Sequence, residues 1–337
     1  MAYLCSRTDD LGSMDEKNKM ITHQLTGVCA LMHLLVDGIC ICCLYLIASR
    51  FSTAQIVGVF ITYNVLAFMS QPFTGMCADR LDRKHWMLLA SVLLLTLAVL
   101  ATSVVMSMEW WTFGTPVVAI LLGAGNSLFH VWGGKQVAVS TGNDIRDLGA
   151  FVATGAFGLS LGAIFCSWPL LYLFLISLCL LSIARLHLDG PTSSTGSSEV
   201  IKSGFGTMFV LLSVIALVVA VMMRSLVSEI FSGGLPKGSE MVLLIGVISM
   251  LGKMSGGWIA HWIGIVRMIV MILLVLVLCL LFRNRSMIAL FVGMFAINCT
   301  MPVTLYLSNV VLLGREGLAF GLLAAALIPG YLFAFLL

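Results

Sequence analysis

Residues 75–84 read GMCADRLDRK and place five charged side chains between two long apolar runs. The whole chain is 60% hydrophobic and only 10% charged, so this stretch is its densest cluster of charge. The apolar runs on either side cover roughly residues 52–78 and 86–107, and each can cross about 30 Å of hydrocarbon as a helix. The pattern predicts a short polar loop that joins two membrane-spanning helices.

The rest of the chain repeats this alternation of long apolar and short polar segments. Mean hydropathy is +1.09 over 337 residues, which excludes an ordinary soluble domain of this size. The apolar runs are continuous, whereas a membrane β-barrel shows segments of about ten residues with alternating character. The sequence therefore predicts an all-α polytopic membrane protein.

Eleven apolar runs have the length of a membrane-spanning helix. The predicted spans are 21–48, 52–78, 86–107, 112–134, 147–166, 168–186, 207–231, 240–262, 264–282, 286–311 and 316–337. A segment rich in Ser, Gly and Thr, residues 188–205, follows the sixth span and is expected to be a flexible cytoplasmic linker. We therefore expect an N-terminal tail at 1–20, a six-helix bundle at 21–187 and a five-helix bundle at 206–337.

The Lys and Arg residues outside the spans are distributed unevenly. With the N-terminus in the cytoplasm, twelve of them fall in cytoplasmic segments and four in outer loops, as the positive-inside rule requires. The first 20 residues are polar and show no pattern of a cleavable signal peptide, and either Met1 or Met14 can be the start. We expect a multi-pass protein of the inner membrane with its N-terminus in the cytoplasm.

Two sequence patterns occur once in each half of the chain. SQPFTGMCADRLDRK (70–84) precedes the third span, and GKMSGGWIAHWIGIVR (252–267) precedes the ninth. RDLGAF (146–151) opens the fifth span, and REGLAF (315–320) opens the eleventh. Their order predicts two parallel repeats of about six helices, the plan of the major facilitator superfamily of transporters.

The charged loop resembles the signature loop that this superfamily carries between its second and third spans. The matching residues are Gly75, Asp79, Arg80, Arg83 and Lys84, whereas Asp82 stands where the family usually has Gly. The resemblance implies a conformational latch: charged contacts hold the two halves together on the cytoplasmic side and break when the protein opens inward. The alternative is an ordinary loop whose positive charge only sets the topology.

Glycines of the fifth span resemble the first part of the antiporter motif of the superfamily. The matching residues are Gly149, Gly158 and Gly162, whereas Ala163 and Cys166-Ser167 depart from the Pro and the Gly pair of the motif. The resemblance implies antiport. The alternative is that these small residues only allow helices to pack closely.

Four further stretches resemble the fosmidomycin-resistance-like branch of efflux proteins. They are HLLVDG (33–38), SQPFTG (70–75), GAGNSLFHVWGG (123–134) and MMRS (222–225). The fourth span lacks the Arg that many drug–proton antiporters carry near its start. This resemblance implies drug efflux that is coupled to protons through other residues.

Ionisable side chains inside the spans mark candidate functional sites, since a charge in hydrocarbon costs at least about 2.5 kcal/mol. His33 and Asp37 are four residues apart on one helical face, and we expect them to couple transport to protons. A structural hydrogen bond between Asp37 and its neighbours is the alternative. Asn126 and His130 share a face of the fourth span and are expected to contact substrate, although a buried His is more often a satisfied core group.

The second half of the chain contributes two cations inside its spans. The repeat makes spans one and seven counterparts, so Arg224 is expected to face Asp37 across a central cavity. There it would be a counter-ion or the site for an anionic group of the substrate, and a purely structural ion pair is the alternative. Aligning Gly75 with Gly257 places Lys253 opposite Gln71. Lys253 is expected to extend outward to the cytoplasmic end.

Together these patterns favour a secondary active transporter that exports a small molecule or drug in exchange for protons by alternating access. One alternative is an importer of a small organic anion from the same superfamily. The other is a transport-dead or truncated membrane protein with a receptor or scaffold role. This last hypothesis arises because the sequence ends at Leu337 after eleven spans, whereas twelve are usual in the superfamily.

Other classes of function find little support in the sequence. No nucleotide-binding loop, catalytic constellation or metal-ligand spacing stands out, and the ten cysteines are expected to be free thiols. We therefore expect no enzyme, no cofactor, no metal site and no nucleic-acid partner. The expected partners are a small-molecule substrate, protons and the lipid bilayer, with a monomeric chain unless a partner replaces the twelfth helix.

Overall fold

The computed structural model describes residues 2–81, 85–108, 111–189 and 206–334, and all regular elements within these ranges are helices. They are α1 (Ala2–Ala48), α2 (Thr53–Asn64), the π-helical turn η1 (Val65–Met69), α3 (Gln71–Arg80), α4 (Trp86–Met108), α5 (Trp111–Ser140), α6 (Ile145–Ile164), α7 (Pro169–Asp189), α8 (Thr207–Gly233), α9 (Ser239–Ile263), α10 (Ile265–Phe282), α11 (Met287–Val311), α12 (Glu316–Ala325) and α13 (Leu327–Ala334).

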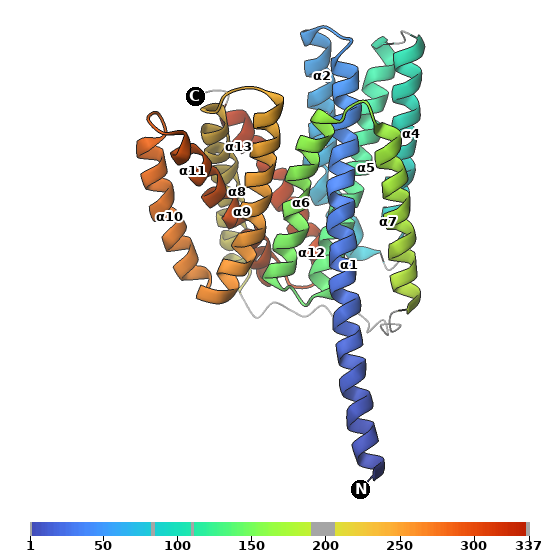
Figure 1. Cartoon of the computed structure of the whole chain (residues 1–337), viewed down its shortest axis with the longest axis vertical. Helices are drawn as coiled ribbons and strands as arrows, with labels where there is room; N and C mark the ends of the chain where they lie inside the picture. Colours follow the sequence, from blue (N-terminus) through green and yellow to red (C-terminus); the bar gives the residue numbers. More distant parts are fainter. Residues whose placement is uncertain (1, 82–84, 109–110, 190–205, 335–337) are drawn as a thin grey trace.

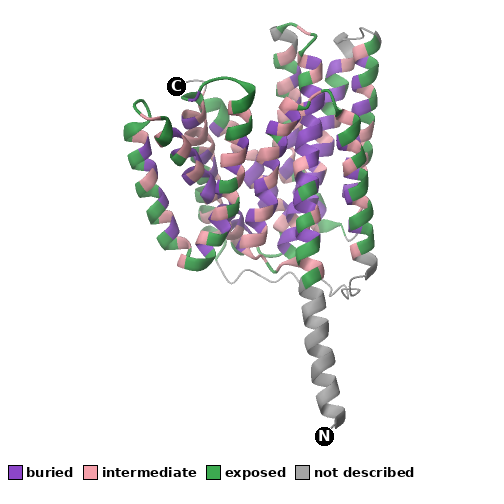
Figure 2. Ribbon diagram, in the orientation of Figure 1, coloured by how far each residue is buried: buried purple, intermediate pink, exposed green. Residues whose placement is uncertain are grey.

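Eleven segments of the described chain are long and apolar enough to cross a membrane as helices. They coincide with the eleven predicted spans to within a few residues. Large apolar side chains such as Leu89, Leu93 and Leu100 are exposed on the outward faces of the helices, whereas Leu88 and Leu95 are buried between them (Figure 2). An apolar outer surface of this extent suits a bilayer, so the chain is a multi-pass membrane protein.

The helices stand side by side in two groups (Figure 1). One group contains α1, α2, α4, α5 and α7, and the other contains α8, α9, α10, α11 and α13. Helices α3 and α6 belong to the first half of the chain, and α12 belongs to the second. The two halves meet where α6 packs on α9 and where α3 packs on α12. The first part of α1 extends away from both groups, below them in Figure 1. Most of the predicted linker at 188–205 lies outside the described residues, since α7 ends at Asp189.

The second predicted span contains an irregularity that hydropathy does not show. Its helix is interrupted by η1, where the Ser70 N–H donates to the Val65 carbonyl at 3.2 Å. Pro72 follows immediately and has no N–H with which to bond the Phe68 carbonyl, which favours a local change in helical pitch. The helix resumes as α3, the segment that contacts α12 of the other half.

The last predicted span is divided into α12 and α13 at Ala326. Pro329 has no N–H to donate to the carbonyl four residues earlier, at Ala325, so the regular helix cannot continue through this point. The N-terminal part, α12, contacts α3, and the C-terminal part, α13, contacts α8.

Glycines of α6 allow this helix to approach two other helices closely. A Cβ atom built on Gly158 would overlap the Leu34 carbonyl, and one built on Gly162 would overlap the Gly38 carbonyl, both on α1. Gly149 instead faces α9, where a built Cβ would lie 3.1 Å from the Lys253 carbonyl oxygen. The glycines of the antiporter-like motif thus lie at helix contacts in both groups, as small residues in membrane proteins commonly do.

Candidate functional site

Four polar side chains meet inside the first group of helices. α1 contributes His33 and Asp37, and α5 contributes Asn126 and His130, each with at most 5% of its surface exposed. The two i, i+4 pairs face one another, so a single cluster joins residues that the sequence assigned separately to proton coupling and to substrate binding. That division does not follow from the geometry, because Asn126 Nδ2 donates directly to Asp37 Oδ1 at 2.9 Å.

The hydrogen bonds of the two imidazole rings fix where their protons are. His33 Nδ1 lies 2.8 Å from the Phe151 carbonyl oxygen, and His130 Nδ1 lies 2.9 Å from the Asn126 carbonyl oxygen. A carbonyl oxygen only accepts, so each Nδ1 carries a hydrogen and donates it. In the neutral form of either ring, the Nε2 atom is then an unprotonated acceptor.

The two Nε2 atoms point at each other. They are 2.8 Å apart, the length of a hydrogen bond, yet neither has a hydrogen in the neutral tautomer that Nδ1 imposes. One additional proton shared between His33 and His130 satisfies both nitrogens. Asp37 lies beside them, with Oδ2 3.4 Å from His33 Nε2 and Oδ1 3.4 Å from His130 Nε2. The shared proton makes the buried cluster neutral overall, which lowers the cost of burying the carboxylate.

Three of these residues, His33, Asp37 and His130, are also close enough together to be considered as ligands of a metal ion. Ligand atoms of His33, Asp37 and His130 all lie within 4.8 Å of one another. However, two imidazole nitrogens that bind one tetrahedral ion at typical bond lengths lie about 3.3 Å apart. The observed separation of 2.8 Å fits a proton between the rings better than it fits a metal ion. The cluster therefore has the geometry of a candidate proton site.

Helix α6 covers the cluster with a glycine and an aromatic ring. A Cβ built on Gly155 would overlap His33 Nε2 and would lie 2.5 Å from Asp37 Oδ2, so only glycine lets α6 pass this close. The Phe151 ring packs 4.7 Å from the His33 ring, centroid to centroid, and shields the cluster from solvent. Gly155 is not part of the antiporter-like motif, although it lies three residues before Gly158 in the same glycine-rich run.

Arg224 lies on α8, with 6% of its surface exposed. Its Nε and Nη2 atoms are buried and have no hydrogen-bond partner among the described residues. The expected ion pair with Asp37 is not formed within the described part of the chain, because Asp37 is already bonded by Asn126 and flanked by two histidines. Arg224 is thus a buried cation without a counter-ion in the described residues.

Lys253 on α9 is partly buried, and its extension to the cytoplasmic end stays a prediction. Its backbone carbonyl packs against Gly149 of α6, where the two halves meet. The residue at the repeat-related position behaves in the same way. Gln71, which aligns with Lys253, is completely buried in the first half.

The signature loop residues bring the two halves together at the predicted cytoplasmic end. Asp79 accepts hydrogen bonds from the backbone N–H groups of Gly317 at 3.0 Å and Leu318 at 2.8 Å, in the first turn of α12. Arg315, at the N-cap position of α12, makes no side-chain cap of its own. The carboxylate therefore caps a helix of the opposite half, where the helix dipole favours negative charge.

Two further residues support this contact. Lys135 Nζ lies 3.3 Å from Asp79 Oδ1 and donates to the Ala78 carbonyl at 2.7 Å, which fixes the carboxylate in place. Gly75 packs directly on the Gly317 backbone, since a Cβ built on Gly75 would lie 2.6 Å from the Gly317 carbonyl carbon. Arg80 is exposed at the end of α3, and the other two loop residues, Arg83 and Lys84, lie outside the described residues.

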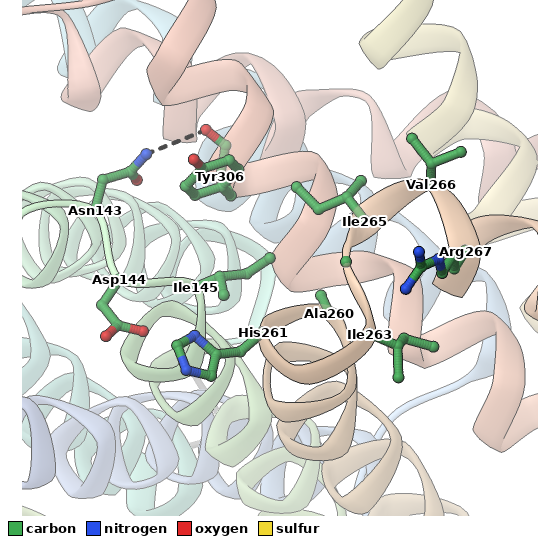
Figure 3. Close-up of a pocket in the computed structure, with 11 residues that line it drawn as sticks. Asn143, Asp144, Ile145, Ala260, His261, Ile263, Ile265, Val266, Arg267 and Tyr306 are labelled. Atoms are coloured by element: carbon green, nitrogen blue, oxygen red, sulfur yellow. Dashed lines mark hydrogen bonds between the residues drawn. The ribbon is translucent and has the colours of Figure 1, made fainter.

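A second contact between the halves occupies the repeat-related position. Gly257 on α9 packs on the Ile145 carbonyl at the start of α6, whose N-cap is Asp144. Three hydrogen bonds from the Arg146 guanidinium hold the pKa of Asp144 below its usual value. His261 aligns with Asp79, but it lines a groove of about 650 Å³ beside Asp144 (Figure 3). The two contacts differ in their carboxylates. Asp79 caps a helix of the opposite half, whereas Asp144 caps its own helix, α6.

Asp79→Asn should weaken the closure of the predicted cytoplasmic end. The amide keeps one acceptor but loses the charge and the contact with Lys135, which should cost about 1–2 kcal/mol, or roughly tenfold in the closed population. Double electron–electron resonance between spin labels on Cys at the exposed positions Leu81 and Leu313 measures this closure. Glu240→Gln, which removes an exposed carboxylate from the far end of α9, is the matched control. Identical distance distributions for Asp79→Asn and the control would contradict a role for Asp79 in closure.

Comparison with known proteins supports the fold. No family model matches the chain, and no curated protein matches its sequence. A variant of the E. coli fucose:proton symporter FucP is similar in structure, with a TM-score of 0.68 and 14% identity over 92% of this chain and 90% of that protein. The human organic anion transporter MFSD10 (TETRAN) gives a TM-score of 0.59 and 17% identity over 93% and 92%. A bacterial homologue of the iron transporter ferroportin gives 0.53 and 14% over 93% and 90%.

The predicted fold class is confirmed by these similarities. The described chain has the major facilitator fold, with eleven helices that can span a membrane. The similar structures are of transporters and not of enzymes. The assignment to the fosmidomycin-resistance-like branch stays a prediction from sequence resemblance.

Proposed function

We propose that this chain is a proton-coupled secondary transporter that works by alternating access. The observation that carries the proposal is the pair of facing Nε2 atoms of His33 and His130 beside Asp37, an arrangement that one extra proton completes. The fold supports it, since proteins of this architecture move a small molecule between two bundles. Asn126 orients the carboxylate in this proposal, and Gly155 allows α6 to cover the site.

The proton must be able to reach the cluster from each side of the membrane in turn. The α3–α12 contact joins the two halves at the predicted cytoplasmic end, whereas the α6–α9 contact runs along the helices from Gly257 at that end to Gly246 near the other. Opening toward the cytoplasm would have to break the bonds from Gly317 and Leu318 to Asp79. The latch role of Gly75, Asp79 and Arg80 is part of this proposal, as are the inner-membrane location and the cytoplasmic N-terminus.

The direction of coupling has two versions. Export of a small molecule or drug in exchange for protons is what the antiporter-like glycines of α6 imply by resemblance. Import of a small organic anion is the alternative, and a specific observation favours it, namely that buried nitrogens of Arg224 have no partner among the described residues. The sign of the proton movement that accompanies substrate separates the two. A transport-dead receptor or scaffold would move no protons at all.

Proteoliposomes with an internal pH indicator test the proposal. We expect at least one compound from a set of carboxylates, phosphonates and amphiphilic drugs to drive proton movement in wild-type vesicles. The movement should be absent in His130→Gln vesicles, because a single imidazole cannot share the proton. His23→Gln replaces a histidine that is exposed at the start of the first span and should behave as wild type. No proton movement with any compound would count against a transporter.

A further inference from the structure

The groove of about 650 Å³ at the predicted cytoplasmic end plays no part in the proton site or in the contact at Asp79. Asn143 and Asp144, just before α6, line it from the first half of the chain. His261, near the end of α9, and Arg267, near the start of α10, line it from the second half (Figure 3). A ligand in this groove would therefore touch both halves at once.

Two residues in left-handed backbone conformations shape the groove. Gly264 joins α9 to α10 as a single residue with a φ of +86°, a conformation that favours glycine. This short connection brings the last turn of α9, with His261, and the first turn of α10, with Arg267, into one groove. Asn143, with a φ of +65°, donates from Nδ2 to the Tyr306 carbonyl at 3.3 Å. That hydrogen bond ties the first half to α11 and gives the groove a defined wall.

The groove offers more positive than negative charge to a ligand. The Asp144 carboxylate accepts three hydrogen bonds from the Arg146 guanidinium, so its charge is already matched. Arg267 is exposed and forms no ion pair with any residue that the structure describes. The exposed His261 adds an imidazole that can donate a hydrogen bond. A phosphate group suits this pair, since a guanidinium binds two of its oxygens with parallel hydrogen bonds.

An exposed apolar stripe of α9 ends at the groove. Leu251, Met254 and Trp258 are exposed, and together with His261 they follow the i, i+3, i+7, i+10 spacing of one helical face. His261 belongs both to this stripe and to the lining of the groove. An amphiphile whose chains lie along the stripe can therefore place its head group between the halves.

Aromatic side chains place the groove at the depth of lipid head groups. The rings of Trp258 and Trp262 pack edge to face with centroids 5.9 Å apart, and 73% of the surface of Trp262 is exposed. The Arg146 guanidinium lies 5.4 Å from the centroid of the Trp258 ring. Trp is enriched at membrane–water interfaces, and basic pockets between spans on the cytoplasmic side bind anionic head groups.

We propose that this groove binds the phosphate of an anionic phospholipid from the predicted cytoplasmic leaflet. Arg267 and His261 contact the phosphate, and the acyl chains cover the stripe that ends at Trp258. A zwitterionic lipid fits less well, because its own cation finds only Asp144, which Arg146 already neutralises. The proposal goes beyond the proposed function, since it concerns neither the transported substrate nor the proton.

The position of the groove gives the lipid an effect on conformation. The head group contacts segments of both halves only while these segments stay together, so its binding favours closure of this end. A larger fraction of anionic lipid in the bilayer should therefore increase the closed population.

Thermal stability of the purified full chain in detergent tests the binding. The probes are dioleoyl phosphatidylglycerol, dioleoyl phosphatidylcholine, which has the same chains and no net charge, and glycerol 3-phosphate, which has no chains. We expect phosphatidylglycerol, at concentrations well above its dissociation constant, to raise Tm by about 2 °C or more relative to phosphatidylcholine. Glycerol 3-phosphate should leave Tm unchanged.

Three results would overturn the proposal. The first is no shift with phosphatidylglycerol. The second is an equal shift with phosphatidylcholine, which would mean that only the chains are bound. The third is an equal shift with glycerol 3-phosphate, which would mean that the site takes a soluble anion.

Variants show whether the groove carries the effect. Arg267→Gln should lose most of the shift with phosphatidylglycerol, whereas Arg267→Lys should retain part of it. Arg283→Gln makes the same change at an exposed position at the other end of α10 and should keep the full shift. A full shift in Arg267→Gln, or an equal loss in Arg283→Gln, would contradict binding in the groove.

The spin-label pair at positions 81 and 313 tests the effect on closure. In nanodiscs, the wild type should show a larger closed population with phosphatidylglycerol than with phosphatidylcholine. The difference should disappear in Arg267→Gln and persist in Arg283→Gln. Identical distance distributions of the wild type in the two lipids would overturn the link between lipid binding and closure.

Discussion

Asp37→Asn vesicles are expected to show no substrate-driven proton movement above that of protein-free vesicles. Asn has the same shape as Asp, and its side-chain oxygen can still accept the hydrogen bond from Asn126, so the helices should pack as before. The variant has no negative charge to stabilise the proton shared by His33 and His130. A protonated imidazole pair would then be an unpaired buried cation, which is strongly unfavourable.

Uptake of labelled substrate, measured beside the pH signal, separates loss of coupling from loss of transport. Glu240→Gln is the matched control, since it makes the same carboxylate-to-amide change at an exposed position. Both proton movement and uptake should be normal in the control. Full proton movement in Asp37→Asn would show that the proton carrier is a different group.

Gly75→Val is expected to prevent closure at the predicted cytoplasmic end. The Gly75 Cα faces the backbone of Gly317 and Leu318, and a Cβ there would overlap main-chain atoms that cannot move away as a side chain can. Overpacking of this kind costs typically about 1–3 kcal/mol, which reduces the closed population by roughly 5- to 150-fold. The spin-label pair at positions 81 and 313 should report longer distances than in the wild type.

A second glycine of the same span provides a matched control. Gly58 lies on α2, and a Cβ built on it meets no atom within 4 Å, so Gly58→Val should leave the distance distribution unchanged. The same substitution, Gly to Val, is compared at both positions. Wild-type distances in Gly75→Val would mean that the α3–α12 contact does not keep the two halves closed.

Hydropathy predicted the fold because the bilayer imposes a simple requirement on every span. A run of about 20 apolar residues must be helical, since its backbone finds no other hydrogen-bond partners in hydrocarbon. Interruptions inside a span are less visible to this reasoning. The π turn before Pro72 and the break before Pro329 interrupt the helices of the second and last spans, yet both spans keep the hydropathy of a membrane helix.

The candidate site was predictable in its parts and not in its assembly. Spacing placed His33 with Asp37 and Asn126 with His130, because side chains four residues apart share a face of a helix. The sequence does not show that these faces meet across α1 and α5, or that backbone carbonyls fix both tautomers. The ion pair expected between Arg224 and Asp37 is not formed among the described residues, since Asp37 is satisfied within its own half.

Contacts to backbone groups are another part of the structure that the sequence did not predict. The signature loop was expected to make charged side-chain contacts, but Asp79 accepts hydrogen bonds from the N–H groups at the start of α12. Such partners carry no sequence signal of their own. Lys253 was expected to extend outward to the cytoplasmic end, and the sequence carried no sign that its backbone packs against Gly149 of the other half.

The most direct test of the shared proton is ¹⁵N NMR of the protein with labelled histidines. The chain has six histidines, and His33→Gln and His130→Gln identify the two resonances of interest. We predict that both rings keep a protonated Nδ1 at every pH and that together they take up one proton, with both Nε2 resonances changing at the same pH. A ring with an unprotonated Nδ1, or two rings that each take up a proton independently, would contradict the proton site.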